Sequence, residues 1–218
     1  MFVHRHPYPP FLFEQATKWI VGTLPPPRFS TGDLKPGDVD FCYGSRDGLL
    51  WPILDRIFQL DLRYETTREA IEQRKAFLKA RQIGICDIVR KAERHKIDAT
   101  DLGMQQVRLR DLLGLLRQYP RVETLLFTGG NSKNGPEYFF RRLLRREGLR
   151  LEPVSQTVPR IHECYLARDR KIRTVSLTAP SGSANRAIGS IPKYKEEKSR
   201  NPHYTVMDFR VEQYREWF

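Results

Sequence analysis

Three short apolar runs, each followed by residues that end a strand, constrain the fold of this chain more than any other feature. The first, residues 19–21, stops at Gly22 and at the prolines 25–27. The second lies in IGICDIV (83–89), and the third lies in VETLLFTGG (122–130). Runs of this length that are rich in β-branched and aromatic residues are typical of buried strands. Proline cannot continue such a strand.

Segments with helical character alternate with these strands, over residues 51–58, 66–82, 109–120 and 135–148. Because strand and helix alternate, we expect a three-layer α/β/α fold with a mostly parallel central sheet and helices on both faces. The remaining pattern predicts two strands around a polar turn at Arg168–Lys171, an exposed loop at 195–204 and a terminal helix at 205–218.

The length of 218 residues suits one domain that buries its own core. We expect a single domain over residues 1–218, with a loosely ordered N-terminal arm (1–14) and a C-terminal extension that contains a helix (192–218). No apolar run approaches the ~20 residues of a membrane-spanning helix, and the first residues lack an apolar core of secretory length. The prediction is a cytoplasmic, nucleoid-associated monomer without membrane contact.

The charge balance indicates an anionic partner. The chain has 38 lysines and arginines against 26 aspartates and glutamates, which gives a net charge of +12. An excess of this size favours binding to nucleic acid or to another anionic surface, although it does not constrain the fold.

The cysteines and histidines form no metal-binding motif. Cys42, Cys86 and Cys164 are far apart in the sequence, and there is neither a CxxC nor an HExxH pattern. His4 and His6 form a near-repeat, but they lie in the expected arm. We therefore expect no metal, no cofactor and reduced thiols. The nucleotide-binding motifs GxGxxG and GxxxxGK[ST] are also absent.

The expected strand ends are rich in small and polar residues. In sheets of this class, ligands bind in the crevice beyond the carboxyl ends of the strands. The segment DFCYGSRDGLLWPIL (40–54) places glycines and Asp47 between two sets of aromatic rings. We interpret this segment as a pocket wall, in which rings stack on a flat ligand and Asp47 takes part in chemistry. A surface turn between core elements is the alternative.

In their order and spacing, these segments resemble the uracil-DNA glycosylase superfamily, and within it the hypoxanthine-DNA glycosylase-like or mismatch-specific branch. GTLP (22–25) is similar to a motif in which a strand precedes G-x-x-P, and YGSRDGLLW (43–51) is similar to a Tyr-led motif that ends in Asn-x-Phe-Trp. Further similar segments are GICDIV (84–89), LLFTGGNS (125–132) and APSGSAN (179–185). The resemblance covers residues 15–190.

The resemblance implies a monofunctional DNA glycosylase. Such an enzyme flips a deaminated or otherwise modified base out of duplex or single-stranded DNA, excises it in base-excision repair and leaves an abasic site. The alternative is a catalytically inactive DNA-binding protein that retains the fold. Leu24 and Gly48 favour this alternative, because they occupy positions where relatives carry a polar group.

The resemblance also implies roles for individual residues. Expected contacts of the flipped nucleotide are Gly22, Thr23, Leu24, Pro25, Phe41, Tyr43, Gly44, Ser45, Gly48, Trp51 and Asn131, with Phe41 or Tyr43 stacking on the base. Expected DNA contacts are Ser132, Pro180, Ser181, Gly182, Ser183, Asn185 and Arg186. Small residues in such a loop let the main chain approach phosphates, to which hydroxyls donate hydrogen bonds. The arginines of the run 141–150 are interpreted as a solvated helix face.

Two carboxylates are candidate catalytic groups. Asp47 can offset positive charge on the sugar or position a water while the C–N bond breaks. Its alternative role is to cap the helix that contains Trp51. Asp87, at the end of the second strand, is the reserve candidate, and it too has a helix N-cap as the alternative.

Overall fold

Alternate side chains of the two central strands, β2 (Lys18–Val21) and β6 (Thr124–Phe127), are buried on opposite faces of one sheet. Trp19 and Phe127 belong to the core on one face, whereas Ile20 and Leu126 belong to the core on the other. A strand that is buried on both faces requires apolar side chains at every position. This requirement explains why the predicted strands are continuous apolar runs.

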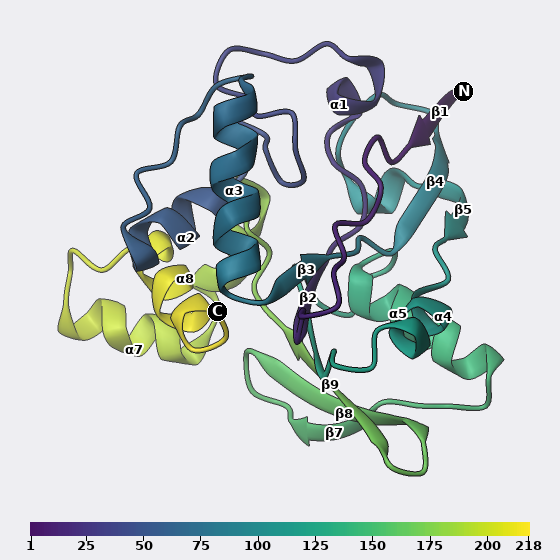
Figure 1. The fold of residues 1–218 in the computed structure, drawn as a ribbon. Coiled ribbons are helices and arrows are strands. Elements are labelled where there is room, and N and C mark those ends of the chain that lie inside the picture. The colour runs from purple at the N-terminus through teal and green to yellow at the C-terminus, as the bar shows by residue number, and fades with distance from the viewer.

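The computed structural model describes residues 1–218 and contains a six-stranded sheet in the order β3-β2-β6-β9-β8-β7 (Figure 1). The neighbours β3, β2, β6 and β9 are parallel, and β8 and β7 extend the sheet in antiparallel pairing. The other strands are β3 (Ile83–Ile85), β7 (Glu152–Ser155), β8 (Arg160–Ala167) and β9 (Arg170–Ser176). The predicted, mostly parallel central sheet is confirmed.

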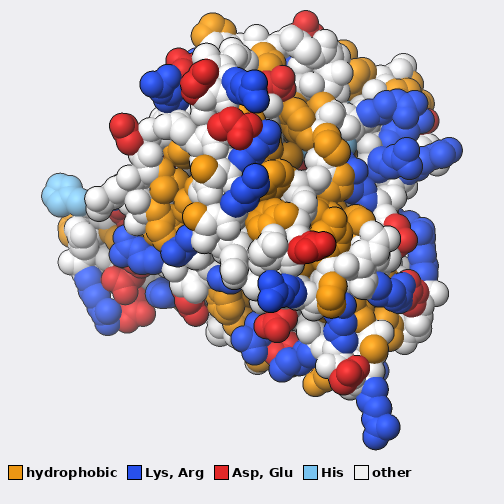
Figure 2. All heavy atoms as spheres, viewed as in Figure 1, with side chains coloured by type: hydrophobic (Ala, Val, Ile, Leu, Met, Phe, Trp, Pro, Cys, Tyr) orange, Lys and Arg blue, Asp and Glu red, His pale blue; other side chains and the backbone are white.

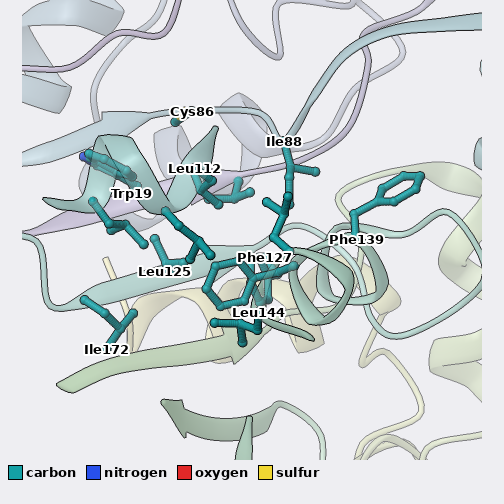
Figure 3. Close-up of a cluster of buried hydrophobic side chains, with 14 of the residues drawn as sticks. Trp19, Cys86, Ile88, Leu112, Leu125, Phe127, Phe139, Leu144 and Ile172 are labelled. Atoms are coloured by element: carbon teal, nitrogen blue, oxygen red, sulfur yellow. The ribbon is translucent and has the colours of Figure 1, made fainter. Parts of the chain in front are cut away.

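Helices cover both faces of this sheet and complete three layers (Figure 1). One face carries α2 (Leu50–Phe58), α3 (Arg68–Ala80) and α8 (Val206–Arg215), and the other carries α4 (Leu112–Gln118) and α5 (Pro136–Arg146). Figure 3 shows the core under α4 and α5, where Leu112, Phe139 and Leu144 pack with strand residues. The predicted three-layer α/β/α fold is confirmed.

Shorter elements connect these layers. They are α1 (Pro27–Thr31), the 3₁₀ turns η1 (Asp101–Gly103) and η2 (Gly182–Ala184), and α6 (Asn185–Gly189). None of the helices combines the length and the apolar composition that crossing a bilayer requires.

A second sheet, antiparallel and three-stranded, has the order β1-β4-β5. Its strands are β1 (Phe2–Arg5), β4 (Val89–Arg94) and β5 (Gln105–Leu109). The prediction of a loosely ordered arm at 1–14 is therefore wrong. β1 pairs with β4, His4 is fully buried, and Phe11 exchanges two backbone hydrogen bonds with Ile85.

The prediction of an exposed loop at 195–204 is also wrong over most of its length, because residues 192–200 form α7 (Pro192–Arg200). Pro192 lies in the first turn, where its fixed φ suits a helix. Glu196 and Arg200 form an ion pair of 2.6 Å one helical turn apart. No residue of α7 is buried, so no apolar periodicity marks the helix in the sequence.

Candidate active site

A cavity of about 660 Å³ lies beyond the carboxyl ends of the four parallel strands. Thr23 follows β2, Asp87 follows β3, Thr128 follows β6 and Pro180 follows β9, and all four line the cavity. The loops meet there because parallel strands end at the same edge of a sheet. Much of the wall is apolar, and its apolar residues include Leu24, Pro25, Pro26, Leu49, Leu102 and Pro180. The volume falls in the range of small-molecule sites, roughly 300–1,000 Å³.

The Asp87 carboxylate in this cavity is held by donors from three separate segments. Oδ1 accepts hydrogen bonds from the Gly22 N–H and the Tyr43 hydroxyl, both at 2.6 Å. Oδ2 accepts from His6 Nε2 at 2.9 Å. An anionic carboxylate only accepts hydrogen bonds, so the three donors suit a negative charge fixed in position. Asp87 is only 7% exposed, which protects these bonds from exchange with water.

His6 reaches Asp87 from the N-terminal arm. The backbone N–H of His6 donates to the Arg90 carbonyl at 3.0 Å, which extends the pairing of β1 and β4 by one residue. Its Nδ1 lies 2.9 Å from the carbonyl oxygen of Tyr8 and 3.2 Å from the Tyr8 nitrogen. Nδ1 can therefore donate as part of an imidazolium or accept as part of a neutral ring. Because Nε2 faces a carboxylate, it donates to Asp87 in both states.

Tyr43 binds the Asp87 oxygen that His6 does not bind. Burial, together with the negative charge of Asp87, raises the pKa of the Tyr43 phenol well above its usual value. The phenol stays neutral and donates to Asp87, so the Thr128 hydroxyl at 3.3 Å donates to the Tyr43 oxygen. The backbone of Tyr43 has a φ of +59°, in the left-handed region that bulky residues rarely adopt. Strain of this kind persists where the surrounding contacts enforce it, and it concentrates at functional sites.

Gly22 is required by this arrangement. A Cβ at position 22 would lie 2.8 Å from Thr128 Oγ1 and 2.9 Å from Asp87 Oδ1, and still closer to the Tyr43 hydroxyl. Any side chain there would separate the three groups. The glycine of the G-x-x-P segment therefore lets the polar cluster approach the backbone, which then donates its own N–H to Asp87.

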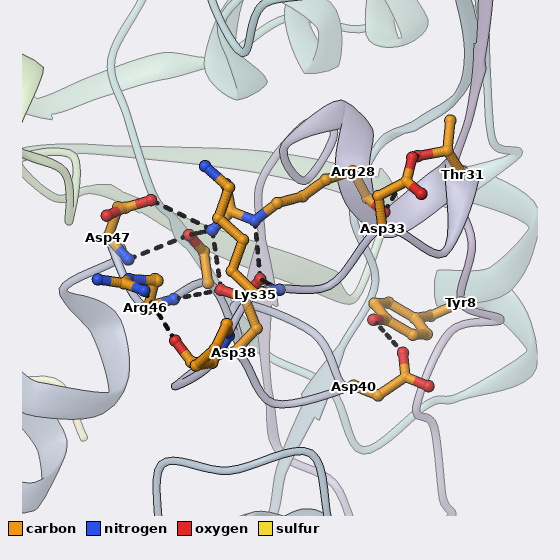
Figure 4. Close-up of polar contacts among 11 residues, drawn as sticks. Tyr8, Arg28, Thr31, Asp33, Lys35, Asp38, Asp40, Arg46 and Asp47 are labelled. Atoms are coloured by element: carbon orange, nitrogen blue, oxygen red, sulfur yellow. Dashed lines mark hydrogen bonds and ion pairs between the residues drawn. The ribbon is translucent and has the colours of Figure 1, made fainter.

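The loop that carries Tyr43 is fixed by an ion pair between Arg28 and the fully buried Asp38 (Figure 4). Arg28 donates to both carboxylate oxygens, at 2.7 and 2.8 Å, and the backbone N–H groups of Lys35 and Arg46 add two bonds of 2.8 Å. Burial opposes the charge of Asp38, but these four bonds outweigh it and lower the pKa of the carboxyl to about 2.

Asp47 lies at the rim of the same cavity, 3.2 Å from Arg28 (Figure 4). Its side chain is 70% exposed. The N-cap position of α2 is Leu49, and no side chain forms a capping hydrogen bond there. The alternative role of Asp47 as a helix cap is therefore wrong. The capping alternative for Asp87 is wrong as well, because the next element is the strand β4.

Most of the residues predicted for the site line the cavity: Thr23, Leu24, Pro25, Tyr43, Gly44, Ser45, Asp47, Gly48, Asp87, Ser132, Pro180, Ser181 and Ser183. The predicted residues that do not line it are Gly22, Phe41, Trp51, Asn131, Gly182, Asn185 and Arg186. Within this second group, Gly22 still acts on the site through its N–H.

Phe41 and Trp51, which the sequence analysis predicts to contact the flipped nucleotide, do not face the cavity. Phe41 and Trp51 lie in the core behind the cavity, at 7% and 1% exposure, and the Trp51 indole donates to the Cys42 carbonyl at 2.9 Å. Of the two rings predicted to stack on a base, Tyr43 alone faces the cavity.

Asn185 supports the 179–185 loop from behind. Its side-chain oxygen accepts a hydrogen bond from the buried Arg210 at 2.8 Å, and Arg210 also donates to the carbonyls of Ala179 and Ser181. The Leu49 N–H donates to Pro180 O at 2.9 Å, so this loop and the Tyr43 loop form one continuous rim.

The site also contains residues that the sequence patterns did not reveal: His6, Tyr8, Arg28, Asp101 and Thr128. No apolar–polar alternation marks the strand that precedes His6, because its exposed position 3 is a valine and its buried position 4 is a histidine. Asp101 accepts from the Thr23 hydroxyl at 2.7 Å. Burial raises the pKa of Asp101, and the Thr23 bond offsets part of this shift. No group of three or more His, Cys, Asp or Glu side chains is arranged to hold a metal ion.

No protein-family model and no curated protein matches this chain. Among solved structures, the chain is similar to a proposed uracil DNA glycosylase from Methanosarcina acetivorans, determined by NMR in solution. The TM-score is 0.54 at 19% sequence identity, and the match covers 97% of this chain and 99% of the other. The two chains share a fold. The likeness supports the α/β/α architecture that the alternation of strands and helices in the sequence predicts.

The Asp38 ion pair predicts how stability depends on pH. Because the folded-state pKa is lowered from 3.8 to about 2, the carboxylate contributes stability that is complete above pH ~4 and is lost as the pH falls through about 2. The free energy of unfolding should therefore fall more steeply with acid in the wild type than in Asp38→Asn. Urea titrations between about pH 6 and pH 2 measure this difference. Asp33→Asn, an exposed neighbour, is the control and should follow the wild type. Parallel curves for Asp38→Asn and wild type would contradict the assignment.

Proposed function

We propose that this chain is a monofunctional DNA glycosylase of the uracil-DNA glycosylase superfamily, which hydrolyses the bond between a modified base and its sugar. The observation that carries the proposal is the Asp87 carboxylate, held by the backbone of a G-x-x-P loop inside a largely apolar cavity. The shared fold and the net charge of +12 support it, because the first agrees with a glycosylase scaffold and the second with a DNA partner.

The cavity suits the chemistry of base excision. The enzyme must first flip the nucleotide out of the stack, which costs a few kcal/mol and is easiest for a mispaired or damaged base. Apolar walls from Leu24, Pro25 and Leu49 exclude water from a planar ring, and Tyr43 contacts it from one side. The neighbouring rim at 179–183 contributes small residues and hydroxyls that suit the sugar and its phosphates.

Asp87 is assigned the central catalytic role. When the C1′–N bond breaks, its electron pair leaves with the base and positive charge develops on the sugar. A fixed carboxylate stabilises that charge and accepts a proton from the water whose oxygen then bonds to C1′. Because Gly22, Tyr43 and His6 hold Asp87 before the substrate arrives, no reorganisation is needed during the reaction.

The geometry favours Asp87 over Asp47, which reverses their order as candidates. Asp47 is largely exposed and shares its charge with Arg28, so water and the guanidinium both weaken its field. Asp87 is buried, and its donors converge from three segments. Asp47 remains close enough to the rim to contact a DNA strand or to orient Arg28.

The rival proposal is a DNA-binding protein that has lost catalysis. Leu24 and Gly48 favour it, because both line the cavity at positions where a polar group is expected and neither can polarise water. The two proposals differ in one product, since an abasic site forms only if the base is excised.

The decisive experiment incubates the protein with duplex and single-stranded DNA that contains uracil, hypoxanthine, mismatched thymine or a bulky modified base. Heating in alkali then cleaves any abasic sites, and a gel reads out the cleavage. The expected result is cleavage at one of these bases. The base that is excised then identifies the branch of the superfamily to which the activity corresponds. Binding to DNA without abasic-site formation on any substrate would favour the rival proposal.

On the substrate identified in this way, Asp87→Asn should lower the single-turnover rate of excision by about two to four orders of magnitude, as expected for a positioned electrostatic or acid–base group. Asp47→Ala, at the exposed carboxylate on the rim, is the control and should stay within about tenfold of the wild type. Thermal melts of both variants exclude unfolding as the cause. A large loss in Asp47→Ala together with an active Asp87→Asn would move the chemistry to the rim.

A further inference from the structure

The outer face of the β1-β4-β5 sheet carries a second, smaller cavity that no part of the glycosylase mechanism uses. Its volume is about 290 Å³, and four of its five lining residues are cations: Arg5, Arg90, Lys91 and Arg108, with Leu109 as the fifth. In Figure 2, blue Lys and Arg side chains gather on the side of the molecule where Figure 1 labels β1, β4 and β5. We call these four residues the basic sheet.

Strand register brings three of these cations onto one face. Arg5 of β1 lies directly opposite Lys91 of β4, and Lys91 lies directly opposite Arg108 of β5. Residues that are directly opposite in neighbouring strands point to the same face, with Cβ atoms about 5 Å apart. Like charges in this position destabilise a sheet. The sheet therefore carries a row of positive charges whose mutual repulsion lowers the stability of the sheet.

No carboxylate in the protein relieves this repulsion. None of the four cations of the basic sheet forms an ion pair, and Glu93, further along β4 and opposite Val3, forms none either. The pairing of β8 and β9 shows the ordinary arrangement. There Glu163 lies opposite Arg173 and forms ion pairs with it and with Lys171, at 3.0 and 3.2 Å.

The basic sheet is continuous with the candidate active site along the chain. Arg5 directly precedes His6, and the carbonyl of Arg90 accepts the His6 backbone N–H at 3.0 Å. Asp87 lies at the start of the segment that becomes β4. The residue that donates to Asp87 and the cations of the basic sheet are therefore neighbours along the same strands. A strand of DNA carries one negative phosphate per ~3.4 Å of helix axis, and phosphates are the anions that Lys and Arg side chains neutralise when a protein binds DNA.

We propose that the basic sheet binds the phosphodiester backbone of DNA beside the nucleotide that enters the Asp87 cavity. This inference rests on the proposed function for the identity of its partner. The contact is electrostatic and independent of base sequence, and it releases condensed counterions from the DNA when it forms. It adds a second DNA surface to the small-residue rim at 179–183 and supplies the positive charge that this rim lacks.

The test compares two variants that remove the same charge. Lys91→Gln/Arg108→Gln removes two cations from the basic sheet, and Arg145→Gln/Arg146→Gln removes two exposed cations from the far end of α5. The Kd for an unmodified duplex is measured for both variants and wild type over a series of salt concentrations. The first variant should weaken binding and reduce the slope of log K against log salt by about one unit per cation, two in all. The α5 variant should keep the wild-type slope.

Stability gives an independent readout. Because Lys91 and Arg108 lie directly opposite each other and repel, Lys91→Gln/Arg108→Gln should melt at or above the temperature of the wild type in the absence of DNA. A salt slope equal to that of the wild type, or an equal reduction in the α5 variant, would overturn the proposal.

The test also separates this inference from the proposed function. If the variant reduces the salt slope but the protein forms no abasic sites, the DNA contact of the basic sheet stands and the proposed glycosylase activity fails. If the protein excises bases but the variant binds DNA like the wild type, the glycosylase activity stands and the DNA contact fails.

Discussion

The hydrogen bonds of the Asp87 carboxylate are the contacts on which the rest of the candidate site depends. They join the end of β2 through Gly22, the loop of Tyr43 and the N-terminal arm through His6, three segments that are far apart in the sequence. Each donor has a structural requirement of its own: a position without a Cβ at residue 22, a left-handed backbone at Tyr43 and an added strand before His6. Because the folded chain meets all three requirements, the Asp87 carboxylate is held in one position in the cavity.

Other buried charges in the molecule support the same cavity. The Arg28–Asp38 pair fixes the loop that carries Tyr43, and Arg210 fixes the 179–185 loop through the carbonyls of Ala179 and Ser181. Breaking such pairs is costly because it leaves a buried charge without a partner. The loops of the rim are therefore tied to buried charges, an arrangement that suits a site in which reacting groups are held in place.

The sequence predicts the sheet and its layers well, because the cause is local. A strand buried on both faces must be apolar at every position, and glycine and proline mark its end, as at residues 19–27. The small sheet could not be predicted in this way, since β1 is short and its partner β4 lies more than 80 residues later. His6 was missed for the same reason.

The errors within the site also have a physical cause. An aromatic ring in a glycine-rich segment suits a pocket wall and the core behind it equally well, and only packing distinguishes Tyr43 from Phe41 and Trp51. The choice between Asp47 and Asp87 likewise depends on burial and on donors from distant segments. The G-x-x-P glycine could be predicted as a close approach of the backbone, but not as the partner of Asp87.

If Asp87 is the catalytic group, Tyr43 and His6 act on excision through this one shared carboxylate. The most direct test is a double-mutant cycle on the single-turnover excision rate, with Tyr43→Phe, His6→Gln and the double variant. Each single change should slow excision, and the double variant should lose less than the product of the two losses, because both changes weaken the hold on the same carboxylate. Single variants that excise at the wild-type rate would contradict it, and so would losses that multiply without coupling.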